Sequence, residues 1–314
     1  MQKNVTRDIS YASSASTRTG RAVIRLMENA TGRLGLIRRV AGYQNEIAEG
    51  DNFWRVMARR FGLYLDIAGG SLDDLPRTGP LVVVANHPYG ILDGLMMGHI
   101  LDAVRGDFRI MAHRVFARAE AMERVILPIN FDDTKAAIAE NIAARAQALD
   151  YLRQGGAVGI FPGGTVSTAA TPFATPADPV WRNFTAKLVT KSDALVVPIY
   201  FDGQNSRLFQ LASHLNYTLR MGLLIREFRA RIHQPVRIVI GKPIPRHALE
   251  ARSGDATATM DFLRKATYDL SRKPRASFGY GYEFEEKYRA RAGVSGAKDG
   301  GRDIRFGVGR AHSL

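Results

Sequence analysis

Residues 81–94 read LVVVANHPYGILDG, and this stretch indicates the class of fold. Its first five residues are apolar and mostly β-branched, which is typical of a strand buried on both faces. Pro88 and Gly90 then mark a turn, and a helix is predicted over residues 91–104. A buried strand that leads through a short turn into a helix is the building unit of α/β proteins.

Short apolar strands and helices alternate on either side of this unit. Further strands are predicted at 108–112, 125–129, 157–161, 194–201 and 236–240, and further helices at 134–154, 181–191, 215–232 and 257–270. We therefore predict an α/β fold with a mixed, partly parallel central sheet flanked by helices, preceded by an N-terminal amphipathic helical segment. In such a sheet, functional groups lie in the loops that follow the strands.

The composition excludes several classes of protein. Hydrophobic residues make up 46% and charged residues 24% of the 314 residues, a balance that excludes a wholly disordered chain. The absence of cysteine excludes disulfides, a thiolate nucleophile and cysteine-based metal sites. No apolar run approaches the ~18–20 residues that span a bilayer, and no secretory signal is recognisable. We expect a protein of the cytoplasm or of the cytoplasmic face of a membrane.

The net charge of +14 is concentrated at the two ends of the chain. Residues 1–60 hold 11 basic and 5 acidic residues (+6), residues 61–218 hold 13 and 15 (−2), and residues 219–314 hold 20 and 10 (+10). A basic surface attracts nucleic acid or anionic lipid, and no motif of a nucleic-acid-binding domain is present. The excess charge therefore favours a membrane surface.

Two predicted helices combine an apolar stripe with arginines. The stretch 52–66 has Phe, Met, Phe and Leu at every fourth position with three arginines between them, and 218–232 follows a similar pattern. This pattern is typical of helices in a membrane interface, and also of helices that pack on a protein core. Because two such helices occur in a strongly basic chain, we expect them to contact a membrane.

His87 and Asp93 form the first candidate catalytic pair. His87 follows the strand 81–85, and Asp93 lies six positions later, where its carboxylate can fold back onto the ring. An imidazole that a carboxylate orients is a general base with a fixed tautomer. The alternative is a surface histidine beside an aspartate that caps the helix.

Two further loops follow predicted strands. Residues 161–167 read FPGGTVS, and their small side chains let backbone N–H groups approach a ligand or a developing oxyanion. Residues 197–201 read VPIYF and lead into the polar loop 202–207. Either loop alone is also compatible with ordinary turn chemistry.

In this order, the three blocks resemble those of the glycerolipid (lysophosphatidate-type) acyltransferase superfamily, over about residues 80–245. That family has a His…Asp motif after a strand, a Phe-Pro-Glu-Gly-Thr-Arg-Ser block and a downstream Val-Pro block. The resemblance implies transfer of a fatty acyl group from a thioester donor to a lipid hydroxyl, without a covalent acyl-enzyme. His87 would be the base, and Asp93 the carboxylate that orients it.

The resemblance also implies a set of substrate contacts. Gly163, Gly164 and Thr165 match the block that seats the acceptor and polarises the reacting centre. Asn86 in the first block, and Asn205 and Arg207 in the third, are the other expected contacts.

Several departures from the family pattern bear on the acceptor. Five residues separate the histidine from the aspartate where the family has four. Gly163 and Val166 stand where the family has Glu and Arg, and the block 127–131 lacks another family arginine. Since a guanidinium fork binds phosphate best, the loss of both arginines favours an acceptor without phosphate.

A lyso-aminolipid such as lyso-ornithine lipid has a free hydroxyl and no phosphate, and the motif forms, with residues 203–209, resemble the ornithine-lipid acyltransferase branch. If Arg114, Arg118 or Arg207 supplies the missing cation, lysophosphatidate is the alternative acceptor. No cofactor is expected, because the acyl thioester of an acyl carrier protein or of coenzyme A is a co-substrate. No metal site is expected either, since Asp93 and His99 lie on different faces of a helix.

We expect three parts: a lead-in with membrane-associating helices (1–66), an acyltransferase domain (67–271) and a basic, mobile tail (272–314). The expected partners are membrane lipids and an acidic acyl carrier protein, which the basic tail would attract, but not nucleic acid. The expected location is the cytoplasmic face of the inner membrane, with peripheral or monotopic attachment. A serine hydrolase is disfavoured because G-x-S-x-G is absent. The non-enzymatic alternative is a basic protein that binds a membrane surface or nucleic acid.

Overall fold

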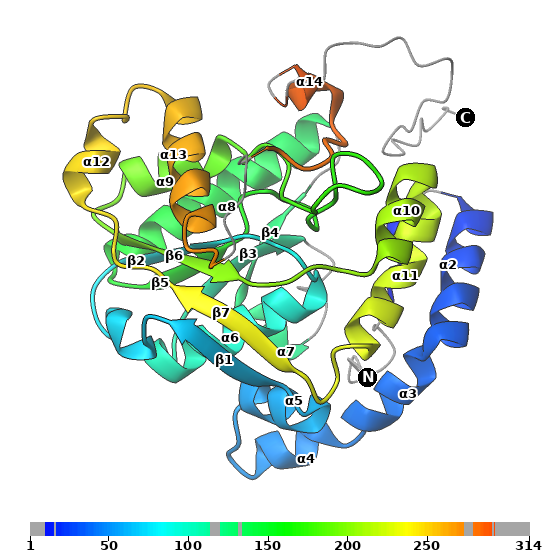
Figure 1. The fold of residues 1–314 in the computed structure, drawn as a ribbon. Coiled ribbons are helices and arrows are strands. Elements are labelled where there is room, and N and C mark those ends of the chain that lie inside the picture. Colours follow the sequence, from blue (N-terminus) through cyan, green and yellow to red (C-terminus); the bar gives the residue numbers. More distant parts are fainter. Residues whose placement is uncertain are drawn as a thin grey trace.

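A computed structural model describes residues 10–15, 17–113, 120–130, 134–272, 279–290 and 292. Within them, one seven-stranded sheet has the order β1-β7-β6-β2-β5-β3-β4 (Figure 1). The strands are β1 Tyr64–Gly69, β2 Leu81–Ala85, β3 Arg109–His113, β4 Ile126–Ile129, β5 Ala157–Ile160, β6 Leu195–Phe201 and β7 Pro235–Ile240. Neighbouring strands are parallel except β6 and β7, which run antiparallel. The predicted α/β fold with a mixed sheet is confirmed.

Helices cover both faces of the sheet, and a further group lies at one flank. The helices of the described residues are η1 Ala12–Ser14, α2 Arg18–Thr31, α3 Arg33–Val40, α4 Tyr43–Ala48, α5 Phe53–Phe61, η2 Leu72–Asp74, α6 Ile91–Arg105, α7 Glu120–Glu123, α8 Lys135–Arg153, α9 Phe184–Thr190, α10 Arg207–Leu215, α11 Tyr217–Arg229, α12 Arg246–Glu250, α13 Ala256–Tyr268 and α14 Glu286–Arg289.

The central strand β2 explains how the two layers are built. All five of its residues are buried, and alternate side chains point to opposite faces. Val83 joins the core that includes residues of α5 and α6, whereas Val82 and Val84 join the core that includes residues of α8, α9 and α13. Because β2 lies between these two cores, its C-terminal end, where the first motif begins, has a fixed position.

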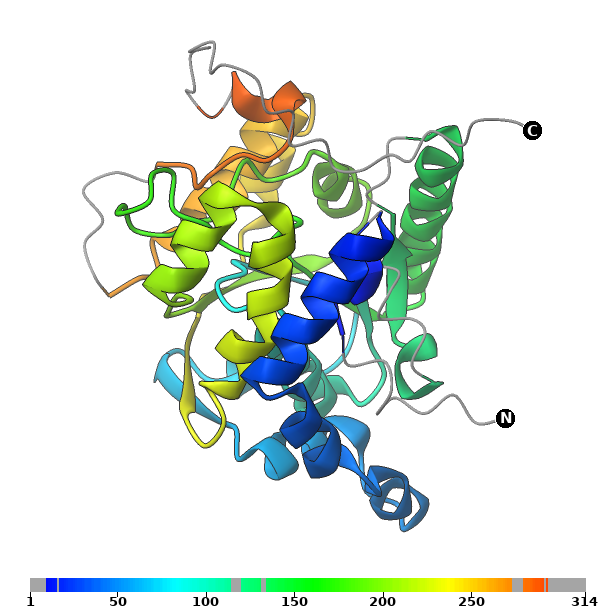
Figure 2. The same ribbon diagram turned by 90° about the vertical axis from the view of Figure 1, so that its right-hand side faces the viewer.

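A third group of helices stands at one flank of the sheet. Helices α2, α10 and α11 lie side by side there, with α11 between the other two (Figure 2). Their shared core, formed with η1, includes Ile24, Phe209 and Leu224, and it also contains Val166 from the second motif. The flanking helices are therefore packed directly against a motif loop.

Two predicted helices differ from the observed ones, each for a local reason. The helix predicted through residue 66 ends at Phe61, because Gly62 adopts a left-handed conformation (φ 62°), and the chain then forms strand β1. The helix predicted over 215–232 begins at Tyr217, because the side chain of Asn216 caps a new helix there.

The apolar stripes predicted to contact a membrane instead pack on the core. On α5, Trp54, Met57 and Phe61 are buried, and on α11 Leu224 and Phe228 are buried. A Cβ on Gly98 of α6 would lie only 2.2 Å from the Trp54 ring, which shows how tightly α5 is docked. The prediction that 52–66 and 218–232 provide the membrane-docking surface is wrong, because a core-facing stripe cannot also face lipid.

Part of the predicted tail is packed on the domain. Glu283 is buried and accepts two hydrogen bonds from Arg182, and the N–H of Gly281 donates to the carbonyl of Asp178. The rest of 272–314, apart from residues 272, 279–290 and 292, lies outside the described residues. The division into 1–66, 67–271 and 272–314 stays a prediction.

Candidate active site

The first motif begins with a side-chain bridge between two strands. Asn86, directly after β2, donates from its amide nitrogen to the carbonyl of Phe201 (3.0 Å) and accepts from the N–H of Phe201 (2.7 Å). Phe201 is the last residue of β6, so the bridge locks the ends of two neighbouring strands together. Asn86 is buried and both polar atoms of its amide are used, so its visible role is to hold the site together.

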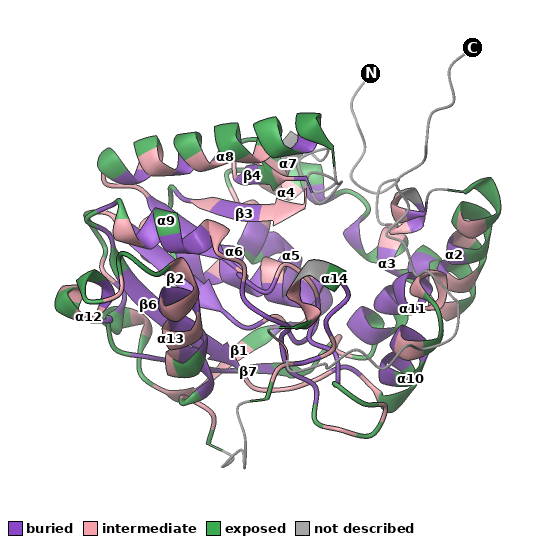
Figure 3. Ribbon diagram, turned by 90° about the horizontal axis from the view of Figure 1, so that it is seen from above, coloured by how far each residue is buried: buried purple, intermediate pink, exposed green. Residues whose placement is uncertain are grey.

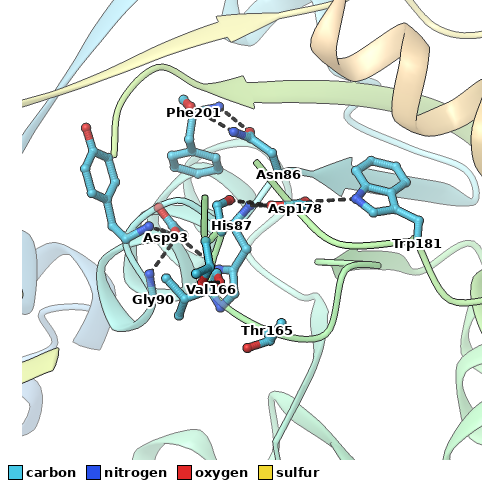
Figure 4. Close-up of polar contacts among 12 residues, drawn as sticks. Asn86, His87, Gly90, Asp93, Thr165, Val166, Asp178, Trp181 and Phe201 are labelled. Atoms are coloured by element: carbon cyan, nitrogen blue, oxygen red, sulfur yellow. Dashed lines mark hydrogen bonds and ion pairs between the residues drawn. The ribbon is translucent and has the colours of Figure 1, made fainter. Parts of the chain in front are cut away.

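His87 and Asp93 lie side by side, as the sequence predicts. Nδ1 of His87 is 3.0 Å from Oδ2 of Asp93 (Figure 4). The two atoms are close but not aligned as a linear hydrogen bond, as is common before substrate binds. The extra residue between them is absorbed by a turn in which Gly90 has a φ of 88°. Because Nδ1 faces the carboxylate, Nε2 is the ring nitrogen available to a substrate.

Asp93 is held where the helix α6 begins. Its Oδ2 also accepts from the N–H groups of Tyr89 (2.7 Å) and Gly90 (2.9 Å), so one carboxylate caps the helix and contacts the imidazole. Burial raises the pKa of Asp93, while the contact with His87 and the two N–H groups act against this rise. Asp93 therefore caps the helix and also lies against the imidazole, so the two interpretations of the sequence do not exclude each other, and its catalytic role stays a prediction.

The imidazole itself is partly accessible. The His87 side chain is 18% exposed, and its ring stacks on Phe161 with 4.5 Å between the centroids and 30° between the planes. Phe161 is the first residue of the second motif. The stacking fixes one face of the ring without blocking the other nitrogen.

The second motif is bonded directly to the first. The N–H of Ser167 donates to the carbonyl of His87 at 2.7 Å, and Gly164 takes a left-handed turn (φ 69°) that closes on Phe161. Thr165 is half-buried. The backbone of the glycine-containing loop and the imidazole therefore line the same part of the molecule.

Asp178 joins these two motifs, and nothing in the sequence pointed to it. Its Oδ1 accepts from the N–H of His87 (3.1 Å) and from the hydroxyl of Ser167 (2.5 Å), and its Oδ2 accepts from Nε1 of Trp181 (2.8 Å) (Figure 4). Asp178 is fully buried. A Cβ on Gly163 would come within 3.2 Å of its side chain, which explains the glycine at that position.

Arg220 of α11 is a second residue that sequence reasoning missed. It is buried, and its guanidinium donates to the hydroxyl of Thr165 (3.1 Å) and to the carbonyl of Val166 (2.9 Å). Helix α11 thus places a cation in contact with the second motif. The sequence shows Arg220 as one of several arginines on an amphipathic helix, and nothing there distinguishes it from the exposed Arg226 and Arg229.

The third block contributes less directly. Arg207 is exposed and donates to the carbonyls of Phe173 and Ala174, so in this structure it fixes a loop. Asn205 is buried, and its amide nitrogen has no hydrogen-bond partner among the described residues. Both stay predicted as substrate contacts, and neither contacts His87 or Asp93 here. Arg114 and Arg118 lie outside the described residues.

Two surveys of the described residues bear on cofactors and membranes. No three His, Asp or Glu side chains among them come together in a way that could hold a metal ion. None of the described helices has both the length and the apolar character needed to cross a bilayer.

Comparisons with known proteins show the family of the chain. A family model described as "Acyltransferase" matches residues 47–276. A lyso-glycine lipid O-acyltransferase of Phocaeicola vulgatus is 26% identical over 208 residues, which cover 63% of this chain and 71% of the relative. A lyso-glycine lipid O-acyltransferase of Bacteroides thetaiotaomicron is 24% identical over 209 residues, or 63% of this chain and 73% of the relative.

Among solved structures, the 1-acyl-sn-glycerophosphate acyltransferase PlsC from Thermotoga maritima aligns over 81% of this chain and 95% of its own, at 13% identity and a TM-score of 0.42. A likeness of this size carries no conclusion about the acceptor.

Proposed function

The chain belongs to the acyltransferase family, and from this premise we propose that it moves a fatty acyl group from a thioester donor to the hydroxyl of a lyso-aminolipid. The observation that carries the proposal is the 3.0 Å contact between Nδ1 of His87 and Asp93, which leaves Nε2 directed away from the carboxylate. A base held in this way, next to a loop rich in small residues, suits attack by a hydroxyl on a carbonyl.

The proposed reaction has two steps and needs no covalent intermediate on the protein. Nε2 of His87 takes the proton from the acceptor hydroxyl while the oxygen attacks the thioester carbonyl, and a tetrahedral intermediate with an anionic oxygen forms. When this intermediate collapses, the carbon–sulfur bond breaks and the imidazolium returns the proton to the leaving sulfur. Asp93 stabilises the imidazolium between the two steps.

The proposed acceptor has no phosphate. The guanidinium that contacts the second motif is that of Arg220. It is only 2% exposed and donates its hydrogen bonds to protein oxygens. It therefore presents no open fork for a phosphate dianion. The relatives named for lyso-glycine lipid support an acceptor of the same class, an N-acylated amino acid with a free hydroxyl on its fatty chain. Lyso-ornithine lipid and lyso-glycine lipid are both of this class.

We propose an acyl carrier protein as the donor. The chain has a net charge of +14, and acyl carrier proteins are acidic, so that opposite charges would steer the encounter. Coenzyme A thioesters are the alternative donor, and a comparison of the two at increasing ionic strength distinguishes them. Turnover with the carrier protein, which approaches over a larger charged surface, should fall more steeply with rising salt than turnover with coenzyme A, which carries only its phosphates.

We propose that the protein binds the cytoplasmic face of the inner membrane through α2 and α10, whose outward sides are exposed (Figure 3). Five exposed aliphatic side chains define this surface, which we call the outer helix face: Val23, Leu26, Leu208, Leu211 and Leu215.

The exposed charged residues of α2, α10 and α11 are all positive. Exposed arginines lie on α2, α10 and α11, at positions 18, 21, 207, 226 and 229. The two acidic residues of these helices, Glu28 and Glu227, are buried and hydrogen-bonded. An apolar surface with only cationic neighbours matches an anionic bilayer.

An assay with purified protein tests the proposed reaction. The donor is an acyl carrier protein thioester, the acceptors are lyso-ornithine lipid, lyso-glycine lipid and lysophosphatidate, and His87→Ala is the control. We expect turnover with the aminolipids that His87→Ala abolishes. Turnover with lysophosphatidate alone overturns the acceptor proposal, and unchanged turnover in His87→Ala overturns the mechanism.

A further inference from the structure

Arg220 is a buried cation surrounded by neutral oxygens. One terminal nitrogen donates to the hydroxyls of Thr168 (2.5 Å) and Ser213 (2.8 Å), and the other donates to the hydroxyl of Thr165 (3.1 Å) and the carbonyl of Val166 (2.9 Å). No carboxylate of the described residues forms an ion pair with it. A buried guanidinium without a carboxylate is unusual, because burial of an unpaired charge is costly.

The charge nevertheless persists at neutral pH. Burial lowers the pKa of Arg220 to about 10, which still leaves the guanidinium protonated. The rings of Phe209 and Phe284 face it, with 4.9 and 4.6 Å from the guanidinium carbon to the ring centroids. Aromatic faces stabilise a desolvated cation without neutralising it. The second motif is therefore held against a permanent positive charge.

The three hydroxyls that accept hydrogen bonds from Arg220 differ in the acceptor to which each donates its own hydrogen bond. A guanidinium has no acceptor, so each hydroxyl must accept from it and keep its proton for another partner. Thr168 donates to the carbonyl of Val166 (3.0 Å), and Ser213 donates to the carbonyl of Phe209 (2.7 Å). The proton of Thr165 has no acceptor among the described residues.

We propose that Arg220 is a positioning residue that makes the Thr165 hydroxyl a dedicated donor to an anionic oxygen of the bound substrate. Thr165 is half-buried and lies two residues before Ser167, whose N–H is bonded to the carbonyl of His87. The hydroxyl thus belongs to a partly exposed residue, lies close along the chain to the first motif and is polarised by a cation. This inference rests on the proposed function.

Two substrate oxygens have the required charge. One is the anionic oxygen of the tetrahedral intermediate, for which a donor lowers the barrier and acts on kcat. The other is the carboxylate that an N-acylated amino acid retains, for which a donor strengthens binding and acts on KM. The shared chemistry is a single O–H donor that meets a negatively charged oxygen.

A double-mutant cycle tests the coupling. We expect Thr165→Val and Arg220→Gln each to lower kcat/KM by on the order of 100-fold, and the double variant to lose little more than either alone. Thr165→Ser, which keeps the hydroxyl, should retain most activity. Ser213→Ala is the matched control, because it removes another hydroxyl bonded to Arg220 that has no proton to offer the substrate.

Arg220→Lys covers the case in which the glutamine variant does not fold. It keeps the charge but loses the fork, and its loss should likewise be non-additive with Thr165→Val. Fully additive losses, or an active Thr165→Val, overturn the inference while leaving the proposed function intact. A wild-type protein without lysolipid turnover overturns both.

The assay also separates the two anions. With an aminolipid acceptor whose carboxylate is methylated, a carboxylate-binding role predicts that wild type falls to the level of Thr165→Val. A role at the intermediate predicts that the loss in kcat caused by Thr165→Val is the same for the free acid and the ester. Either result supports a donor at Thr165, and equal activity of Thr165→Val and wild type on both acceptors contradicts it.

Discussion

The backbone N–H of Ser167 lies 2.7 Å from the carbonyl oxygen of His87 and donates a hydrogen bond to it. Two motifs far apart in the chain are therefore joined main chain to main chain. Asp178 adds a second link, because its Oδ1 accepts from both the N–H of His87 and the hydroxyl of Ser167. The imidazole consequently has a fixed position relative to the loop that would receive the substrate.

Replacement of His87 by glutamine tests its role as the base. The glutamine side chain is polar and of similar size but cannot take up a proton, so kcat should fall by about 100-fold to 10,000-fold. The melting temperature should stay near that of wild type, because His87 is partly exposed and the amide of a glutamine can still donate to Asp93. Binding of the lysolipid, measured separately, should be kept. Loss of binding together with turnover would contradict a role confined to proton transfer.

Replacement of Asp93 by asparagine should separate activity from stability. Burial raises the pKa of Asp93, which means that folding disfavours the charged form of this carboxyl. Asparagine can still accept from the N–H groups of Tyr89 and Gly90 without that charge. We expect kcat to fall by about 100-fold or more, since the imidazolium loses its counter-charge, while the free energy of unfolding stays equal or increases.

The pH dependence of that variant follows from the sign of the shift. A carboxyl whose pKa is raised by folding stabilises the fold at low pH, and this contribution is lost as pH rises from its usual pKa through the raised one. The stability of Asp93→Asn relative to wild type should therefore grow with pH across that window. Urea unfolding at a series of pH values measures it, and a difference that shrinks with rising pH would refute the assignment.

Asp178→Ala should damage both stability and activity. It leaves the N–H of His87, the hydroxyl of Ser167 and the indole N–H of Trp181 without their acceptor, at about 1–3 kcal/mol for each buried donor. We expect the free energy of unfolding to drop by about 3 kcal/mol or more. Ser167→Ala, which removes one donor together with its need for an acceptor, should cost much less. Calorimetry and acyl transfer assays of both variants make the comparison.

The outer helix face should govern attachment to vesicles. A triple change of Leu26, Leu211 and Leu215 to aspartate should lower binding to anionic vesicles by at least about tenfold. Each replacement removes the favourable free energy of transferring a leucine side chain from water into the bilayer. The matched control changes Ile138 and Ile142 to aspartate. These two residues are similarly exposed, but they belong to α8, a helix that packs on β4 and β5 and not on the outer helix face. Cosedimentation measures binding. Equal losses in the two variants would show that general apolar exposure, and not this face, drives attachment.

The sequence predicted the parts of the fold that depend on local pattern. The buried strand β2, the turn with Pro88 and Gly90 and the helix α6 are continuous in the chain, and their apolar periodicity is visible there. Because the loops after β2, β5 and β6 follow adjacent parallel strands, the meeting of the first two motifs at one edge could also be predicted.

What the sequence could not predict depends on contacts between distant segments. The four-residue spacing of α5 predicts a helix through residue 66, because Leu65 continues this spacing beyond Gly62, and the start of β1 therefore reads as helix. Asp178 and Arg220 lie outside every motif, and only the folded chain brings them to His87 and Thr165. The prediction that the stripes on α5 and α11 contact a membrane is wrong for a related reason, since lipid and protein core select the same pattern and only the folded chain shows that these stripes are buried.

The antiparallel pairing of β6 and β7 has a consequence for how this family member could diversify. Such neighbours can be joined by a tight hairpin, yet residues 202–234 intervene and carry α10 and α11. This segment bears Arg220 and three of the four leucines of the outer helix face, while the strands at its two ends stay in register. Substitutions in residues 202–234 can therefore change the lipid specificity without altering the sheet. Chimaeras that exchange only this segment between family members are a direct test of whether it determines substrate preference.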